Sequence, residues 1–79
     1  MEITPGSVVV SRAGHDKGRI YAVVAVSGGM AELADGRTRK TDCPKRKSVR
    51  HISYLGKLET ADARSLEDHI LRELLRSWR

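Results

Sequence analysis

Residues 13–24, AGHDKGRIYAVV, set a charged, turn-forming tetrad between two valine-rich runs. Residues 7–12 before it form a short β-branched run that is typical of a strand, and residues 19–26 after it form a second one. Gly18 stands where the second strand must begin abruptly, so we expect a backbone geometry there that a Cβ atom would disfavour. The stretch therefore predicts two strands joined by a turn that presents charge.

The second predicted strand is apolar on both of its faces. Period-2 alternation places Ile20, Ala22, Val24 and Val26 on one face, and it places Tyr21, Val23 and Ala25 on the other. We expect both faces to be at least partly covered, and we expect Tyr21 to pack inside rather than to stack on a base.

Three more short strands are predicted further along the chain. Met30–Ala34 is the third, and the dipeptide Asp35-Gly36 after it favours a two-residue hairpin, because both central positions of such a turn need positive φ. Residues 38–41 form the fourth strand, and residues 49–53 form the fifth. Five short strands with tight turns predict a small, strongly bent antiparallel barrel.

The tail changes from the period of a strand to the period of a helix. An amphipathic helix is predicted over residues 67–78, with Ser65 as its N-cap, and its apolar face consists of Leu66, Ile70, Leu74 and Trp78, with Leu71 and Leu75 beside them. This face either packs on an open side of the barrel or forms a docking surface for another protein or a second copy of the chain.

Positive charge is concentrated in one segment. The whole chain has a net charge of +5, yet residues 37–57 hold eight lysines and arginines against Asp42 alone. Such a patch is the electrostatic footprint of a phosphate-backbone partner, although a charge run can also be a solvated face. We therefore divide the chain into residues 1–57, a barrel with this basic extension, and residues 58–79, the helical segment.

Several classes of function find no support in the sequence. The single cysteine, Cys43, rules out an internal disulfide and suits a reducing cytoplasm, and no apolar run approaches the roughly 18 residues of a membrane span. The zinc-ligand spacings and the phosphate-cradling GxxxxGK[ST] motif are absent, and no catalytic trio is recognisable. We expect a cytoplasmic protein without a cofactor, a metal or an enzymatic activity.

A longer stretch resembles a known family. Residues 6–52, GSVVVSRAGHDKGRIYAVVAVSGGMAELADGRTRKTDCPKRKSVRHI, resemble the KOW motif and its basic extension, as found in the SH3-like barrels of ribosomal large-subunit proteins. In particular, they resemble the small bacterial KOW-domain RNA-binding proteins related to an archaeal and eukaryotic large-subunit ribosomal protein family. The glycine of the motif corresponds to Gly18, whereas His15 stands where arginine or lysine is usual. The resemblance implies an SH3-like barrel that binds structured RNA of the ribosome or of translation.

The basic side chains are the expected contacts to RNA phosphates. Because A-form RNA hides its base edges in a deep and narrow major groove, a small barrel would recognise backbone and shape. The expected contacts are Arg37, Arg39, Lys40, Lys45, Arg46, Lys47 and Arg50 in the basic segment and His15, Lys17 and Arg19 in the first loop.

The alternative function is that of a protein-interaction adaptor. In that case the barrel and the helix would bind polypeptides through Leu66, Ile70, Leu71, Leu74, Leu75 and Trp78. Both functions can coexist, with RNA on the basic segment and a ribosomal or other protein partner on the helix. Salt separates them, because phosphate contacts weaken steeply with salt and apolar docking depends on it weakly.

Overall fold

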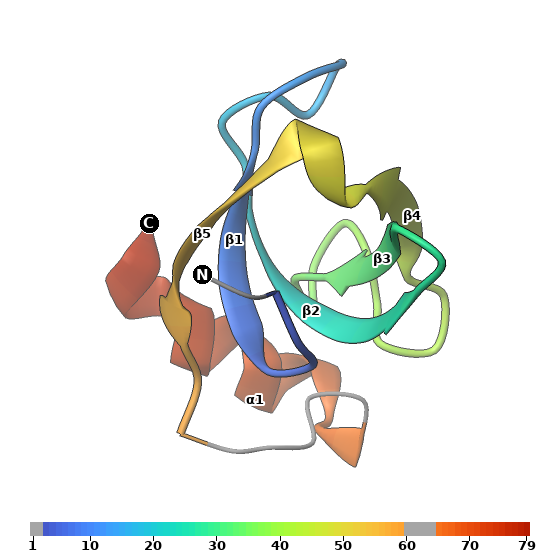
Figure 1. The fold of residues 1–79 in the computed structure, drawn as a ribbon. Coiled ribbons are helices and arrows are strands. Elements are labelled where there is room, and N and C mark those ends of the chain that lie inside the picture. The colour runs from blue at the N-terminus through green and yellow to red at the C-terminus, as the bar shows by residue number, and fades with distance from the viewer. Residues whose placement is uncertain (1–2, 60–64) are drawn as a thin grey trace.

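A computed structural model describes residues 3–59 and 65–79 as a five-stranded antiparallel sheet with a C-terminal helix packed beside it (Figure 1). The strands are β1 Ser7–Ser11, β2 Ile20–Ser27, β3 Met30–Ala34, β4 Lys45–Ser48 and β5 Ile52–Lys57. A 3-10 helix, η1, spans Val49–His51, the α-helix α1 spans Asp68–Leu75, and a second 3-10 helix, η3, spans Arg76–Trp78. Residues 60–64 of the predicted helical segment lie outside the described residues.

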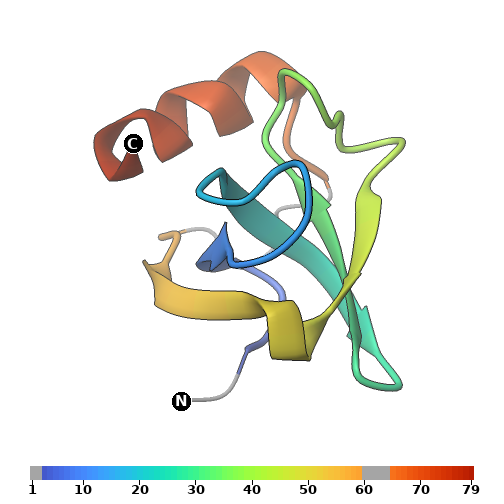
Figure 2. The same ribbon diagram turned by 90° about the horizontal axis from the view of Figure 1, so that it is seen from above.

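The sheet curls into a small barrel. Its strand order is β4-β3-β2-β1-β5, so β4 and β5 are the two edges. Only η1 separates them in the chain, and three residues can join two edge strands only where the edges approach each other (Figure 2). The predicted SH3-like antiparallel barrel followed by an amphipathic helix is therefore confirmed.

Two apolar clusters lie on opposite sides of β2. One fills the barrel and contains Val9, Tyr21, Val23, Ala31, Leu33 and Ile52. The other lies between the sheet and the helix and contains Val8, Ala22, Val24, Ala34, Leu58, Leu71 and Leu75. This confirms that both faces of β2 are covered, because each face contributes to a different cluster.

Val26 departs from the predicted alternation. It packs against the cluster inside the barrel, on the side of Val23, although strict alternation assigns it to the side of Val24. The pairing of β2 with β3 shifts register between Val23 and Ala25. A β-bulge adds one residue to a strand, and it therefore exchanges the faces of all residues beyond it.

The connection between β3 and β4 differs from the prediction. The Asp35-Gly36 hairpin and the strand over residues 38–41 are wrong, since β3 pairs with β4, which begins only after Pro44. The Asp35 carboxylate explains the difference, because its Oδ1 accepts hydrogen bonds of 2.9 Å from the backbone N–H groups of both Arg37 and Arg39. Such local bonds satisfy the backbone in a turn and compete with a strand ladder.

The last strand begins later than predicted. Residues 49–51 form η1 rather than a strand, and the Ser48 side chain accepts a hydrogen bond from the Arg50 N–H at its start. The strand itself runs over Ile52–Lys57. Val49 and Ile52 nevertheless turn inward as expected, since both pack in the cluster inside the barrel.

The helix packs on the barrel through Leu71 and Leu75, which are fully buried. Leu66 and Trp78 are half-buried against the same cluster, whereas Ile70 and Leu74 remain 40% and 37% exposed. The face of the helix that packs on the barrel is thus centred on Leu71 and Leu75, and not on the predicted series that recurs every four residues from Leu66 to Trp78.

The predicted cap of the helix is wrong. Glu67, not Ser65, occupies the N-cap of α1, and its side chain makes no capping hydrogen bond. The start of the helix is held instead by the β3–β4 loop. Thr41 donates its backbone N–H to Asp68 Oδ1 at 2.8 Å and its hydroxyl to the Leu66 carbonyl at 3.3 Å.

Candidate nucleic-acid interface

We define the basic end of the barrel as residues 12–19 and 35–51, which comprise the β1–β2 loop, the β3–β4 loop, β4 and η1. The backbone N–H of Arg12 donates to the His51 carbonyl at 2.8 Å, which joins the β1–β2 loop to η1. The Arg19 guanidinium donates to Thr38 Oγ1 at 3.0 Å, which joins the same loop to the β3–β4 loop. Segments far apart in the sequence therefore form one continuous surface.

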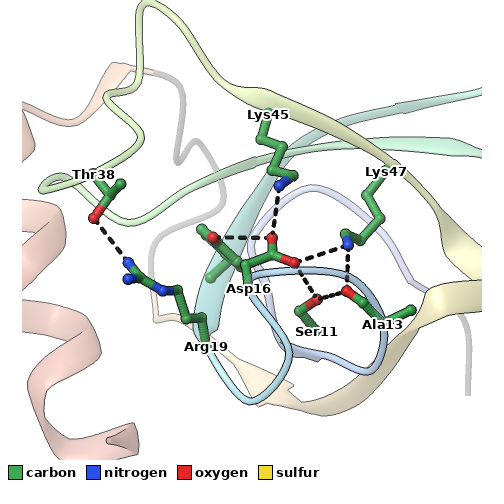
Figure 3. A network of polar contacts seen from close by, with 8 residues as sticks. Ser11, Ala13, Asp16, Arg19, Thr38, Lys45 and Lys47 are labelled. Carbon is green, nitrogen blue, oxygen red and sulfur yellow. Dashed lines mark hydrogen bonds and ion pairs between the residues drawn. The ribbon is translucent and has the colours of Figure 1, made fainter.

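Asp16 is the centre of the contacts that hold the basic end together. Its side chain is buried and sits between Lys45 and Lys47 of β4, as Figure 3 shows. Lys47 Nζ lies 2.9 Å from Asp16 Oδ1, and Lys45 Nζ lies 3.1 Å from Oδ2. The carboxylate thus ties the β1–β2 loop to β4 through two ion pairs.

Two neutral hydroxyl groups also lie within hydrogen-bond distance of this carboxylate. The Ser11 hydroxyl lies 3.0 Å from Asp16 Oδ1, and the Tyr21 hydroxyl donates to Oδ2 at 3.2 Å. The second Lys47 contact is to the Ala13 carbonyl at 2.8 Å, so its ammonium is also well satisfied. A carboxylate with this many donors is stabilised in its ionised form.

The pKa of Asp16 follows from two opposing effects. Burial raises it, because a charged carboxylate loses hydration, but the hydrogen bonds from Lys47, Lys45 and Ser11 lower it by more. The net result holds the pKa of Asp16 well below its ordinary value of 3.8. The group is therefore a permanent anion at neutral pH and is unsuited to proton transfer there.

Tyr21 is packed inside the barrel as predicted, and it also has a polar contact that its sequence context does not reveal. Burial and the neighbouring Asp16 charge raise the pKa of its hydroxyl to about 12. We expect Tyr21→Phe to lower the free energy of unfolding by about 1 kcal/mol, because it removes one buried hydrogen bond and keeps the ring. Urea unfolding at neutral pH measures this, and a loss above about 3 kcal/mol would mean that the ring has also repacked.

The predicted RNA-binding residues fall into two groups. Lys45 and Lys47 face Asp16, with side chains 27% and 10% exposed, and so they are structural as well as basic. Arg39 is half-buried. The others are exposed and lie in the two loops, β4 and η1: His15, Lys17, Arg19, Arg37, Lys40, Arg46 and Arg50.

Burial also sorts the acids of this region. Residues 12–19 and 35–51 contain ten lysines and arginines against Asp16, Asp35 and Asp42. Asp16 and Asp35 are both buried, at 6% exposure each, while Asp42 is exposed. The anions are thus drawn inward and most cations face solvent, which makes the outer surface more positive than a count of charges suggests.

Asp16 is the residue that sequence reasoning missed. The tetrad containing it was expected to present charge, and His15 and Lys17 do so, but Asp16 points inward. One signal was available, because Lys45 and Lys47 alternate with Arg46 and must share a face if they lie on a strand. Two cations on one inward face require an anion opposite them.

The residues expected to dock a protein are divided by the packing of the helix. Leu71 and Leu75 belong to the interior, so they are unavailable to a partner in this structure.

Within the described residues, no group of three or more histidines, cysteines or acids is placed to hold a metal ion, and Cys43 is exposed. No helix among residues 3–59 and 65–79 has the length and apolar character that crossing a membrane requires.

The sequence matches no protein-family model and no curated protein sequence. The surface itself is therefore the basis for a functional assignment.

Proposed function

We propose that this protein is a non-enzymatic, cytoplasmic RNA-binding protein of the ribosome or of translation, which contacts the backbone of structured RNA through its basic end. The observation that supports this most strongly is the separation of charge at that end. Asp16 and Asp35 are internal, while exposed lysines and arginines extend over two loops, β4 and η1. Phosphates repeat along a nucleic acid, and a cationic surface built from several segments can contact more than one of them.

The exposed arginines suit this ligand chemically. Arg37, Arg46 and Arg50 each present a planar guanidinium that can pair with two phosphate oxygens at once. The resemblance of residues 6–52 to the KOW motif supports RNA in particular among phosphate-rich partners. An adaptor function is less well supported, because the helix buries Leu71 and Leu75 against the barrel. Of its large apolar side chains, Ile70 and Leu74 are the exposed ones.

The test is fluorescence anisotropy of a labelled, folded ribosomal RNA fragment over a range of salt, compared with a duplex DNA and a scrambled single strand. We expect a preference for the folded RNA and a log-log salt slope of about −3 to −5, which corresponds to roughly four to six phosphate contacts. Weak binding without preference would overturn the proposal.

Two arginines allow a sharper prediction. Arg46 faces outward between Lys45 and Lys47, and Arg50 is exposed on η1. We expect the double variant Arg46→Gln/Arg50→Gln to make the salt slope shallower by roughly 1.5, because each lost phosphate contact removes about 0.7 to 0.9. Neither side chain contacts Asp16 in the described structure, so the fold should be preserved.

Lys57 provides the matched control. It is exposed at the opposite end of the barrel, where it pairs in register with Ser7 and donates to Thr4 Oγ1 at 2.9 Å. The Lys57→Gln variant also loses one positive charge, but the slope should stay within error of the parent value. An equal loss per charge in both variants would show that net charge, rather than the basic end, determines binding.

A further inference from the structure

An open cleft of about 600 Å³ lies beside the basic end, where the C-terminal segment meets the two loops. Arg19 comes from the end of the β1–β2 loop, Arg37 from the β3–β4 loop, and Trp78 and Arg79 from η3 and the residue after it. Three arginines and an indole therefore converge from three separate parts of the chain. The periodicity of the helix predicts only protein docking for Trp78.

The charge of this cleft is positive. Asp35 is the acid that lines it, and Asp35 Oδ1 already accepts hydrogen bonds from the N–H groups of Arg37 and Arg39. Arg19 donates to Thr38 Oγ1, which holds its guanidinium at the rim and leaves further N–H groups for a ligand. The cleft is thus prepared for an anion such as a phosphate.

The indole is held firmly in place. Trp78 is half-buried against the cluster under the helix, and the benzo part of its ring lies directly against Gly56 of β5. A Cβ at Gly56 would overlap this ring, so the absence of a side chain there makes room for it. A fixed aromatic ring beside arginines is a platform on which a base stacks at low entropic cost.

The neighbouring surface of α1 is also cationic. Arg37 and Arg79 line a second hollow together with Arg72 and Arg76 of the helical segment. Arg76 is paired with Glu73 at 3.2 Å, and both side chains are exposed. The first cleft therefore opens onto further cations along which a phosphate backbone can continue.

We propose that the cleft binds one nucleotide of a single-stranded RNA segment, with the base stacked on Trp78 and the adjoining phosphates held by Arg37 and Arg79. This inference rests on the proposed RNA-binding function and deepens it. It assigns to the helical segment a contact with an unpaired base, next to a basic end that contacts structured backbone. Base stacking tolerates every base, so the site recognises an unpaired nucleotide rather than a sequence.

Trp78 is the single tryptophan of the chain, so its fluorescence reports on this cleft alone. The experiment titrates the protein with a short oligoadenylate and with a ribose-phosphate oligomer of equal length that lacks bases. We expect oligoadenylate to quench the Trp78 emission and the abasic oligomer to leave it unchanged. Equal quenching by both would overturn base stacking.

Two variants separate the ring from the charge. Trp78→Leu keeps an apolar side chain against the cluster and should weaken oligoadenylate binding about tenfold, as expected for one lost stacking contact, without weakening binding of the abasic oligomer. Arg79→Gln should weaken binding of both oligomers. It retains the indole, so it tests the cleft even if Trp78→Leu fails to fold. An unchanged affinity of a folded Arg79→Gln variant for both oligomers would overturn the assignment.

The control is Arg46→Gln, which removes a cation from the basic end outside the cleft. This variant should weaken binding of the labelled ribosomal RNA fragment. At saturation with oligoadenylate, its Trp78 emission should be quenched as much as in the parent. Anisotropy of the labelled ribosomal RNA fragment, recorded alongside, distinguishes the two proposals. Binding of that fragment without any oligoadenylate-dependent quenching would overturn the cleft alone, whereas no binding of any RNA would overturn the proposed function and the cleft with it.

Discussion

Replacing Asp16 by alanine should lower the free energy of unfolding by about 3 kcal/mol. This value is at the lower limit of the roughly 3 to 5 kcal/mol lost when one partner of a buried ion pair is removed. The variant leaves Lys45 and Lys47 side by side without the carboxylate that both contact. It also removes the acceptor of the Tyr21 hydroxyl and a partner of Ser11. For a chain of this length, we expect a decrease of about 15 °C in Tm.

Thermal and urea unfolding followed by circular dichroism measure this loss, and Asp42→Ala is its control. Asp42 lies in the same basic end but is exposed, so its removal should change the stability by no more than about 0.5 kcal/mol. If the two variants lose equal stability, then the contacts of Asp16 contribute nothing beyond its charge.

The same carboxylate predicts a dependence of stability on pH. Because the pKa of Asp16 is lower in the folded protein than its ordinary value of 3.8, its contribution is fully present above that value. The contribution is lost progressively as the pH falls from there toward the folded pKa. The difference in stability between the parent and Asp16→Asn should therefore be constant at neutral pH and shrink in acid. A difference that stays the same down to pH ~2 would contradict the depressed pKa.

Local patterns predicted those parts of the fold in which neighbouring residues decide the structure. The β-branched run of residues 7–12 identified β1, period-2 alternation identified β2, and Met30–Ala34 was predicted with its observed bounds. The abrupt start of β2 was also correct, since Gly18 has a φ of +90°. In each of these cases the preference of a few adjacent side chains agrees with the pairing that the barrel requires.

The position of β4 could not be predicted in the same way. The side chain of Asp35 bonds to two backbone N–H groups and turns the chain away from a hairpin, so the next strand forms only after Pro44. That displacement puts Lys45 and Lys47 on a strand, with alternate side chains facing Asp16 about thirty residues earlier. A count of charges along the sequence treats all lysines alike, whereas the pairing of β3 with β4 turns two of them toward Asp16.

The cleft depends on contacts at even longer range. Trp78 and Arg79 were assigned to the helical segment alone, because periodicity describes one face of a helix and not what that face adjoins. The position of the helix is determined by Leu71 and Leu75 in the core and by Thr41, which bonds to Asp68. These contacts bring the end of the chain beside Arg37.

Replacing Gly36 by alanine should lower the free energy of unfolding by about 3 to 4 kcal/mol. Gly36 has a φ of +78°, a conformation that costs most other residues about 1 kcal/mol or more. A Cβ there would also overlap the Asp68 carbonyl oxygen and lie 3.1 Å from Cγ of Arg72. The β3–β4 loop would have to move away from α1, and overpacking of this kind adds about 1 to 3 kcal/mol.

Gly18→Ala isolates the backbone part of this effect. Gly18 has a φ of +90°, but a Cβ there would have no neighbour within 4 Å, so we expect a loss of about 1.5 kcal/mol from conformation alone. Urea unfolding of both variants gives their free energies of unfolding. The additional loss in Gly36→Ala then measures the cost of the contact between the loop and the helix. Equal losses would mean that the loop does not press on α1. Because Arg37 follows Gly36 directly and Trp78 lies beyond the helix, a loop that moves away should also reduce the quenching of Trp78 by oligoadenylate in the folded Gly36→Ala variant.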